Sequence, residues 1–168
     1  GRWHISGASW DATDTLVPSI ESAIRNIMLG QDYYRKEFGV ESTDIFLPDC
    51  FGFGWTLPAI ASHCGLIGFS SQKLQWRKPF YGNDKYPFTV GLWQGIDGST
   101  IMMTHGYDYN QRFEDGDLSE NKDLLELTGH SPLHMVYRYY GTGDIGGSPT
   151  LESVRAIEKG LQGNGPLQ

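Results

Sequence analysis

The feature that most constrains this chain is the alternation of short apolar runs with longer stretches of helical periodicity. Short apolar runs are typical of buried strands, and strands that alternate with helices are typical of βα units in a parallel sheet. The runs that predict strands lie at residues 3–7, 44–47, 66–70 and 135–140. Two further runs, 88–93 and 99–104, flank the turn 95–98 and predict paired strands. The sequence therefore predicts an α/β fold with a parallel sheet and crossover helices.

Helix signals fill the intervals between these runs. The first helix is expected to begin at Pro18, a favourable first-turn residue, and to end at Phe38 with Gly39 as its C-terminal cap. Its apolar residues recur at the spacing of one helical face. Further helices are expected at about 57–63, 122–127 and 150–160. The segment 75–87 is polar, aromatic and rich in Pro and Gly, which predicts a long loop.

Two aspartates stand where parallel α/β folds carry their reacting groups, after the carboxyl ends of strands. Asp49 follows the run 45–47, and Asp144 follows the run 136–140 in a loop with four glycines. Glycoside hydrolysis needs two facing carboxylates, one that attacks or activates and one that donates a proton. An aspartate after a strand is also a common helix N-cap, so a structural role stays open for both.

Other kinds of site find little support. The glycine-rich loop lacks the order of a phosphate-binding loop, and no G-x-S-x-G elbow is present. His130 and His134 are separated by Pro132, which argues against a helical metal pair. His63 is expected to have a packing role on its helix, and His105 ends a strand where it could line a cleft. Cys50 and Cys64 lack a C-x-x-C spacing and are interpreted as buried free thiols.

Charge and hydropathy limit the classes of binding partner that the chain is expected to have. The net charge is −7 and no Lys/Arg cluster occurs, which argues against nucleic acid and anionic membranes. No run of 18 apolar residues is present, so nothing is expected to span a bilayer. The sequence predicts a soluble chain and leaves open whether it resides in the cytoplasm, a periplasm or a secretory lumen.

The segment 44–53, with the letters DIFLPDCFGF, resembles the nucleophile segment of glycoside hydrolase family 38, the class II α-mannosidases. Several other segments resemble family segments in the same order along the chain. They are residues 1–10, 21–25, 71–76, 93–99 and 143–150, of which the last is similar to the acid/base loop.

This resemblance implies a (β/α)7 barrel, one zinc ion and hydrolysis of terminal α-mannosyl residues of glycans with net retention. It implies that Asp49 is both nucleophile and metal ligand, and that Asp144 is the general acid/base. Tyr107 and Asp108 match sugar-binding positions, and Lys73 falls where the family places a cation near the nucleophile and the substrate. The two catalytic carboxylates are then expected ~5–5.5 Å apart, as in retaining glycosidases.

The resemblance also implies that residues 1–168 form one incomplete catalytic-barrel domain. The family's upstream His-x-Asp metal pair and its downstream metal-binding His fall outside this sequence, so the other zinc ligands are expected elsewhere. The isolated segment is expected to be inactive. Two alternatives stay open, a metal-dependent carbohydrate deacetylase on a related barrel and a sugar-binding remnant without catalysis. Linkage preference and oligomeric state are not determined by the sequence.

Overall fold

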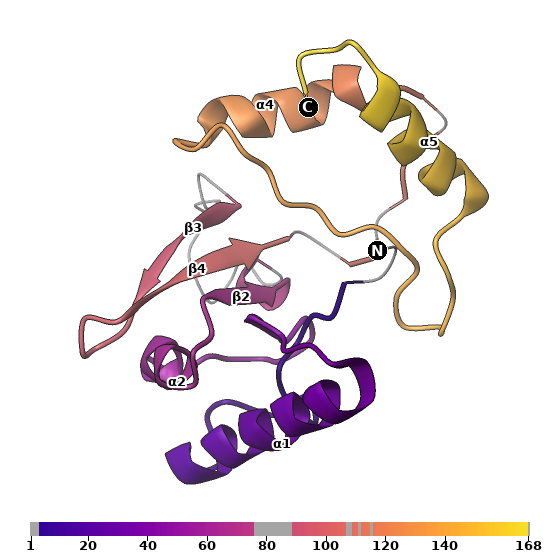
Figure 1. Cartoon of the computed structure of the whole chain (residues 1–168). Coiled ribbons are helices and arrows are strands. Elements are labelled where there is room, and N and C mark those ends of the chain that lie inside the picture. Colours follow the sequence, from indigo (N-terminus) through magenta and orange to yellow (C-terminus); the bar gives the residue numbers. More distant parts are fainter. Residues whose placement is uncertain (1–3, 76–88, 107–108, 111, 115, 168) are drawn as a thin grey trace. The chain divides into compact units, whose positions relative to one another are not determined.

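The structure is a computed structural model that describes residues 4–75, 89–106, 109–110, 112–114 and 116–167. Its contacts divide the chain into two compact units. The sheet unit consists of residues 1–74 and 91–105, and the helical unit consists of residues 75–90 and 106–168. Figure 1 shows the strands within the first and the helices α4 and α5 within the second.

The sheet unit is built on four strands in the order β1-β2-β4-β3. They are β1 (Asp44–Phe46), β2 (Gly68–Ser71), β3 (Val90–Gln94) and β4 (Thr100–His105). β1 pairs with β2, and β2 with β4, in parallel. β3 and β4 are joined by a hairpin turn in which the Gly95 amide donates to the Ser99 carbonyl at 2.8 Å. The predicted α/β fold is therefore confirmed, and so is the predicted pair of strands around the turn 95–98.

Helix α1 (Ile20–Phe38) has the ends that its sequence predicts. The Ser19 hydroxyl accepts the amide of Ser22, so the helix begins just after the predicted Pro18. Gly39 has a left-handed conformation with φ of 68°, and its amide donates to the carbonyl of Arg35. This conformation favours glycine, and the predicted cap is confirmed.

The core of the sheet unit lies between the strands and the helices α1 and α2 (Leu57–His63), which Figure 1 shows on one side of the sheet. α2 has the bounds that the sequence predicts and connects β1 to the parallel strand β2. An aromatic group joins loop and sheet, since Phe69 meets Phe53 at 4.9 Å and Trp93 at 5.1 Å, both edge to face. The core side chains that are buried include Ile27, Ile45, Leu47, Leu57, Ile60, Leu66 and Ile101. His63 is exposed, so its expected packing role is wrong.

Two predicted strands are absent from the described residues. Residues 4–7 are not a strand, because Gly7 has φ of 82° and the Ser6 hydroxyl bonds the Asp44 carboxylate at 2.6 Å. Residues 135–140 are not a strand either. The Tyr137 amide donates to the Thr89 hydroxyl at 2.7 Å, so a side chain provides the partner that a neighbouring strand would offer.

The helical unit contains α4 (Lys122–His130), α5 (Leu151–Gln162) and the short turn η2 (Leu118–Glu120). α4 and α5 start where a side-chain oxygen caps the first turn, from Asn121 and Thr150 respectively. Both predicted helices are confirmed. The predicted loop 75–87 lies almost wholly outside the described residues.

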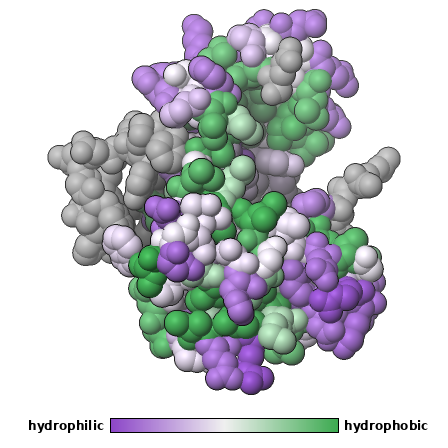
Figure 2. All heavy atoms as spheres, turned by 60° about the vertical axis from the view of Figure 1, so that its left-hand side comes forward, coloured by the Kyte–Doolittle hydropathy of each residue, from purple (hydrophilic) through white to green (hydrophobic). Residues whose placement is uncertain are grey.

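The described surface carries many large hydrophobic side chains. Val17 is 83% exposed, Trp55 78% and Leu161 83%. Figure 2 shows hydrophobic groups spread over much of the face in view, between hydrophilic ones. Across the described part of the chain, no helix is both long and apolar enough to cross a membrane.

Candidate active site

Asp49 stands in a turn just after β1, at the edge where the parallel strands β1, β2 and β4 all end. We call this edge the carboxyl edge. The chain is anchored there by Leu47, which is 1% exposed and whose amide donates to the Ser70 carbonyl at 3.0 Å. Pro48 and Asp49 form the turn that follows, and the Asp49 side chain is 57% exposed. The carboxylate is thus held at a fixed place and remains open to solvent.

Lys73 lies beside Asp49. It begins the short helical turn η1 (Lys73–Gln75) directly after β2, and its Nζ is 2.6 Å from Oδ1 of Asp49. Only 7% of the lysine side chain is exposed. The ammonium also lies 4.6 Å from the centre of the Phe51 ring, within the range of a cation–π contact. Two neighbouring strands therefore bring a carboxylate and a mostly buried cation together at the carboxyl edge.

The third parallel strand, β4, ends at His105, which is fully buried. Tyr107 and Asp108, the predicted sugar-binding residues, follow it in the chain but lie outside the described residues. Their roles stay predictions. The expectation that His105 lines a cleft is wrong, because its side chain is fully buried.

Cys50 is a neighbour of Asp49 without the properties of a nucleophile. Its thiol donates to the Thr13 carbonyl at 3.1 Å. Burial raises the pKa of the thiol above its ordinary value, and the negative charges of Asp14 and Asp49 raise that pKa further. Because the thiolate is the reactive form, this raised pKa leaves Cys50 less reactive than an ordinary free cysteine. Cys50 is free, as predicted, but only partly buried.

Asp144 lies in the helical unit, in the glycine-rich loop. Its backbone has φ of 63°, a left-handed conformation that aspartate tolerates better than most residues. Its Oδ1 accepts the hydroxyl of Tyr109 at 2.6 Å, and the neighbouring Gly143 amide donates to the Asn110 side chain at 3.3 Å. A Cβ added at Gly143 would overlap the Tyr109 ring, so glycine is what allows this close approach. The carboxylate is exposed and held from one side by a phenol.

Asp49 belongs to the sheet unit and Asp144 to the helical unit. The expected distance between the two carboxylates therefore stays a prediction. Phe51 and Tyr109, which contact these groups, were not singled out by the sequence. Their sequence positions carried a signal. Phe51 is two residues after the predicted nucleophile Asp49, and Tyr109 directly follows the predicted sugar-binding residue Asp108.

Zinc was expected at Asp49. Among the described residues, no three His, Cys, Asp or Glu side chains gather as a metal site requires. These residues therefore do not fit a zinc ion by themselves.

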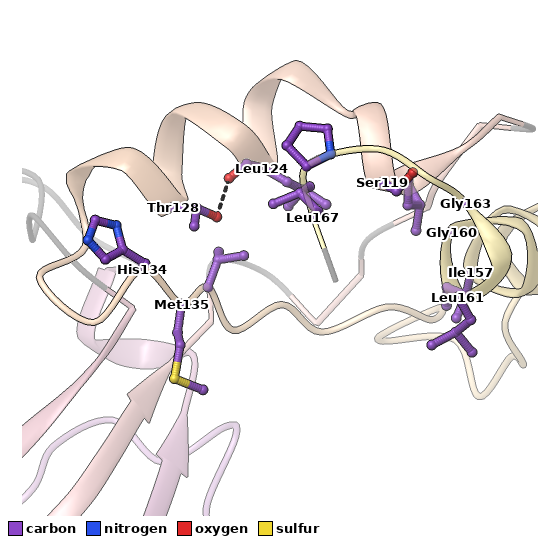
Figure 3. A pocket seen from close by; sticks show the side chains of 13 residues that line it. Ser119, Leu124, Thr128, His134, Met135, Ile157, Gly160, Leu161, Gly163 and Leu167 are labelled. Carbon is purple, nitrogen blue, oxygen red and sulfur yellow. Dashed lines mark hydrogen bonds between the residues drawn. The ribbon is translucent and has the colours of Figure 1, made fainter.

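A cavity of about 640 Å³ lies within the helical unit. Its lining is mainly apolar and comes from α4, α5, the segment 134–136 and the chain after α5 (Figure 3). The Thr128 hydroxyl, which could offer a polar contact there, already donates to the Leu124 carbonyl at 2.7 Å. None of the predicted site residues lines this cavity.

The matching family model and the similar curated proteins all indicate the same family. The family model for the N-terminal domain of glycosyl hydrolases family 38 matches residues 1–163. Alpha-mannosidase G of Dictyostelium discoideum is 35% identical over 164 residues, which cover 94% of this chain and 14% of the relative. An alpha-mannosidase of Saccharomyces cerevisiae is 32% identical over 155 residues, which cover 91% of this chain and 14% of the relative. The chain thus spans about one seventh of the length of these relatives.

Two solved structures resemble the fold. An alpha-mannosidase from Enterococcus faecalis V583 matches with a TM-score of 0.50 and 20% identity over 59% of this chain and 11% of that one. A 4-alpha-glucanotransferase from Thermococcus litoralis matches with a TM-score of 0.55 and 14% identity over 97% of this chain and 25% of that one. At these identities the likeness concerns the fold alone.

Proposed function

Since this chain belongs to glycosyl hydrolase family 38, we propose that it supplies the nucleophile and the acid/base of a retaining α-mannosidase. The observation that carries the proposal is the pair of Asp49 and Lys73 at the carboxyl edge, 2.6 Å apart. Active sites of parallel α/β folds occupy this edge. The substrates would be glycans with terminal α-mannosyl residues, because both relatives named above are alpha-mannosidases.

In the first half of the reaction, a carboxylate oxygen of Asp49 attacks the anomeric carbon. The bond to the leaving oxygen breaks, and Asp144 gives its proton to that oxygen. Lys73 supports the first step, since its ammonium lies 2.6 Å from Oδ1 of Asp49 and fixes the orientation of the carboxylate through a charge-assisted contact. The exposure of Asp49 supports it too, because the sugar must reach the attacking oxygen.

In the second half, Asp144 takes a proton from water, and the water oxygen attacks the anomeric carbon to release Asp49. Two inversions give net retention. The Tyr109 hydroxyl on Oδ1 of Asp144 supports this role, because it fixes the orientation of the carboxylate and leaves its other oxygen for the proton. Tyr107, Asp108 and Lys73 would contact the sugar.

The family also suggests zinc as cofactor, with Asp49 as one ligand. When bound, zinc supplies Lewis-acid chemistry to the sugar hydroxyls. The ligands that would complete its coordination are not among the described residues. They would come from other parts of a longer polypeptide, in line with the 14% coverage of the relatives.

We further propose that the four strands belong to a (β/α)7 barrel that other segments complete. The parallel run β1-β2-β4 supports this fold, as does the likeness to the alpha-mannosidase from Enterococcus faecalis V583. The many exposed large hydrophobic side chains support it as well, since further elements would cover them.

Replacement of each carboxylate by alanine in the complete enzyme tests the two roles. Asp49→Ala should abolish hydrolysis, and added azide should then give the β-mannosyl azide by a single inversion. Asp144→Ala should spare aryl mannosides with good leaving groups, which need little protonation, and azide should give the α-mannosyl azide.

The matched control is Asp97→Asn, a change of an exposed aspartate in the β3–β4 turn of the sheet unit. Its activity should stay within about twofold of the wild type. Equal losses on activated and natural substrates for Asp144→Ala would refute its acid role. Full activity of Asp49→Ala would refute the assignment of the nucleophile.

A further inference from the structure

The position of Lys73 depends on the residue at which β2 ends. That residue is Ser71, whose side chain is fully buried. Its hydroxyl oxygen accepts the backbone amide of Lys73 at 3.2 Å. A serine that bonds the amide two residues later forms a tight local turn. The turn sets the direction in which the chain leaves β2 and enters η1.

This direction matters because the lysine side chain is long and flexible. A free lysine loses considerable rotamer entropy when its ammonium is held in one place. In the structure the ammonium lies 2.6 Å from Asp49 and 4.6 Å from the Phe51 ring centre, and both partners come from the loop after β1. A backbone fixed at Lys73 reduces the freedom that these contacts must overcome.

Ser71 is also shielded from water. In the parallel register of β2 and β4 it is opposite His105, which is fully buried. Neighbours in register project their side chains to the same face of a sheet. Water therefore has little access to the Lys73 amide if the serine hydroxyl is removed.

We propose that Ser71 is a positioning residue of the active site, which acts through Lys73 by holding its ammonium against the Asp49 carboxylate. This inference rests on the proposed function, in which Asp49 is the nucleophile. Ser71 does not touch the reacting atoms, and its effect is transmitted through the hydrogen bond that its hydroxyl oxygen accepts from the Lys73 amide.

The chain contains a matched control in the same unit. Ser42 is 2% exposed, and its hydroxyl lies 3.4 Å from the amide of Asp44, also two residues later. That turn precedes β1 and so lies at the amino end of the strands, opposite to the carboxyl edge. Ser42→Ala removes the same kind of bond, together with the bond that the Ser42 hydroxyl donates to the Asp44 carboxylate at 2.9 Å, and has no link to Lys73.

The test uses the complete enzyme with an activated aryl α-mannoside. Ser71→Ala should lower kcat/KM about tenfold, less than the ~100-fold loss typical of a 1 Å misplacement. Ser42→Ala should leave kcat/KM within about twofold. Ser71→Thr keeps the hydroxyl and should restore most of the activity. Urea unfolding of each variant shows that it is folded under the assay conditions.

A double-mutant cycle with Lys73→Met separates positioning from a merely structural role. If Ser71 acts through the lysine, Ser71→Ala should cost nothing further in the Lys73→Met background. An equal loss in both backgrounds, or no loss from Ser71→Ala alone, would overturn the inference. This cycle decides the question even if the threonine variant does not fold.

The failure of the proposed function would look different. In that case Asp49→Ala would keep its activity, or the wild type would not cleave α-mannosides. Absence of coupling between Ser71 and Lys73, with activity still dependent on Asp49, would refute this inference alone.

Discussion

Removing either member of the Asp49–Lys73 pair should have unequal effects on the free energy of unfolding. The two side chains differ in their access to water, with 57% of Asp49 exposed and 7% of Lys73. After Lys73→Met, the carboxylate can be hydrated where it stands. After Asp49→Ala, the ammonium loses a carboxylate at 2.6 Å in a place that water hardly reaches.

The magnitudes follow from these exposures. Breaking a fully buried pair costs ~3–5 kcal/mol, and the exposed side of Asp49 reduces this to about 2 kcal/mol for Asp49→Ala. Lys73→Met gives up a cation–π contact of ~0.5–1 kcal/mol. Methionine keeps the apolar stem and can contact the Phe51 ring through sulfur, which offsets ~0.3–1.5 kcal/mol. We therefore expect Lys73→Met to cost below about 1 kcal/mol.

The assay is urea unfolding followed by tryptophan fluorescence, to which Trp93, partly buried against the core of the sheet unit, contributes. The double variant Asp49→Ala/Lys73→Met should be more stable than Asp49→Ala, because the buried charge is then removed as well. Equal losses for the two single variants, or a double variant with the sum of both losses, would refute this reasoning.

Three further predictions concern the surroundings of the site. Gly143→Ala places a methyl group against the Tyr109 ring and should displace the hydroxyl from Asp144, with about a tenfold fall in kcat/KM for natural mannosides; an unchanged value would contradict this. Cys50 should react with iodoacetamide at pH 8 more slowly than a free thiol, because its raised pKa leaves less thiolate. Asp49→Ala should accelerate this reaction, and an unchanged rate would show that the Asp49 carboxylate does not affect the thiol. The isolated chain should bind Zn²⁺ weakly and should not cleave aryl mannosides; tight stoichiometric binding in calorimetry would mean that the metal site is misplaced.

Local chemistry made the helices predictable. Pro18 just before α1 and Gly39 just after it mark boundaries that depend on a few adjacent residues. The strands were harder. Residues 135–140 have the composition of a strand, but a strand needs a neighbour, and Thr89 supplies the hydrogen bond instead. Such pairings are set by the tertiary fold and leave no trace in local sequence.

The candidate site likewise combines residues that local sequence identifies with residues whose role depends on the tertiary fold. The sequence pointed to Asp49 through its place after a strand and to Lys73 through the family resemblance. Ser71 and Tyr109 were not identified, because their contacts depend on a turn and on the path of a loop. A buried serine and a half-buried loop tyrosine are common in proteins, and only the structure distinguishes these two from the many others.

The strand order of the sheet unit has a consequence for synthesis on the ribosome. β2 pairs with β4, which is translated later than both β2 and β3. At ~5–20 residues per second, about two to seven seconds pass between the translation of Ser71 and that of His105. During this time one edge of β2 lacks its final partner. The nascent chain therefore passes through a stage in which this strand is open to wrong pairing with other chains, and a holding chaperone would bind most usefully then.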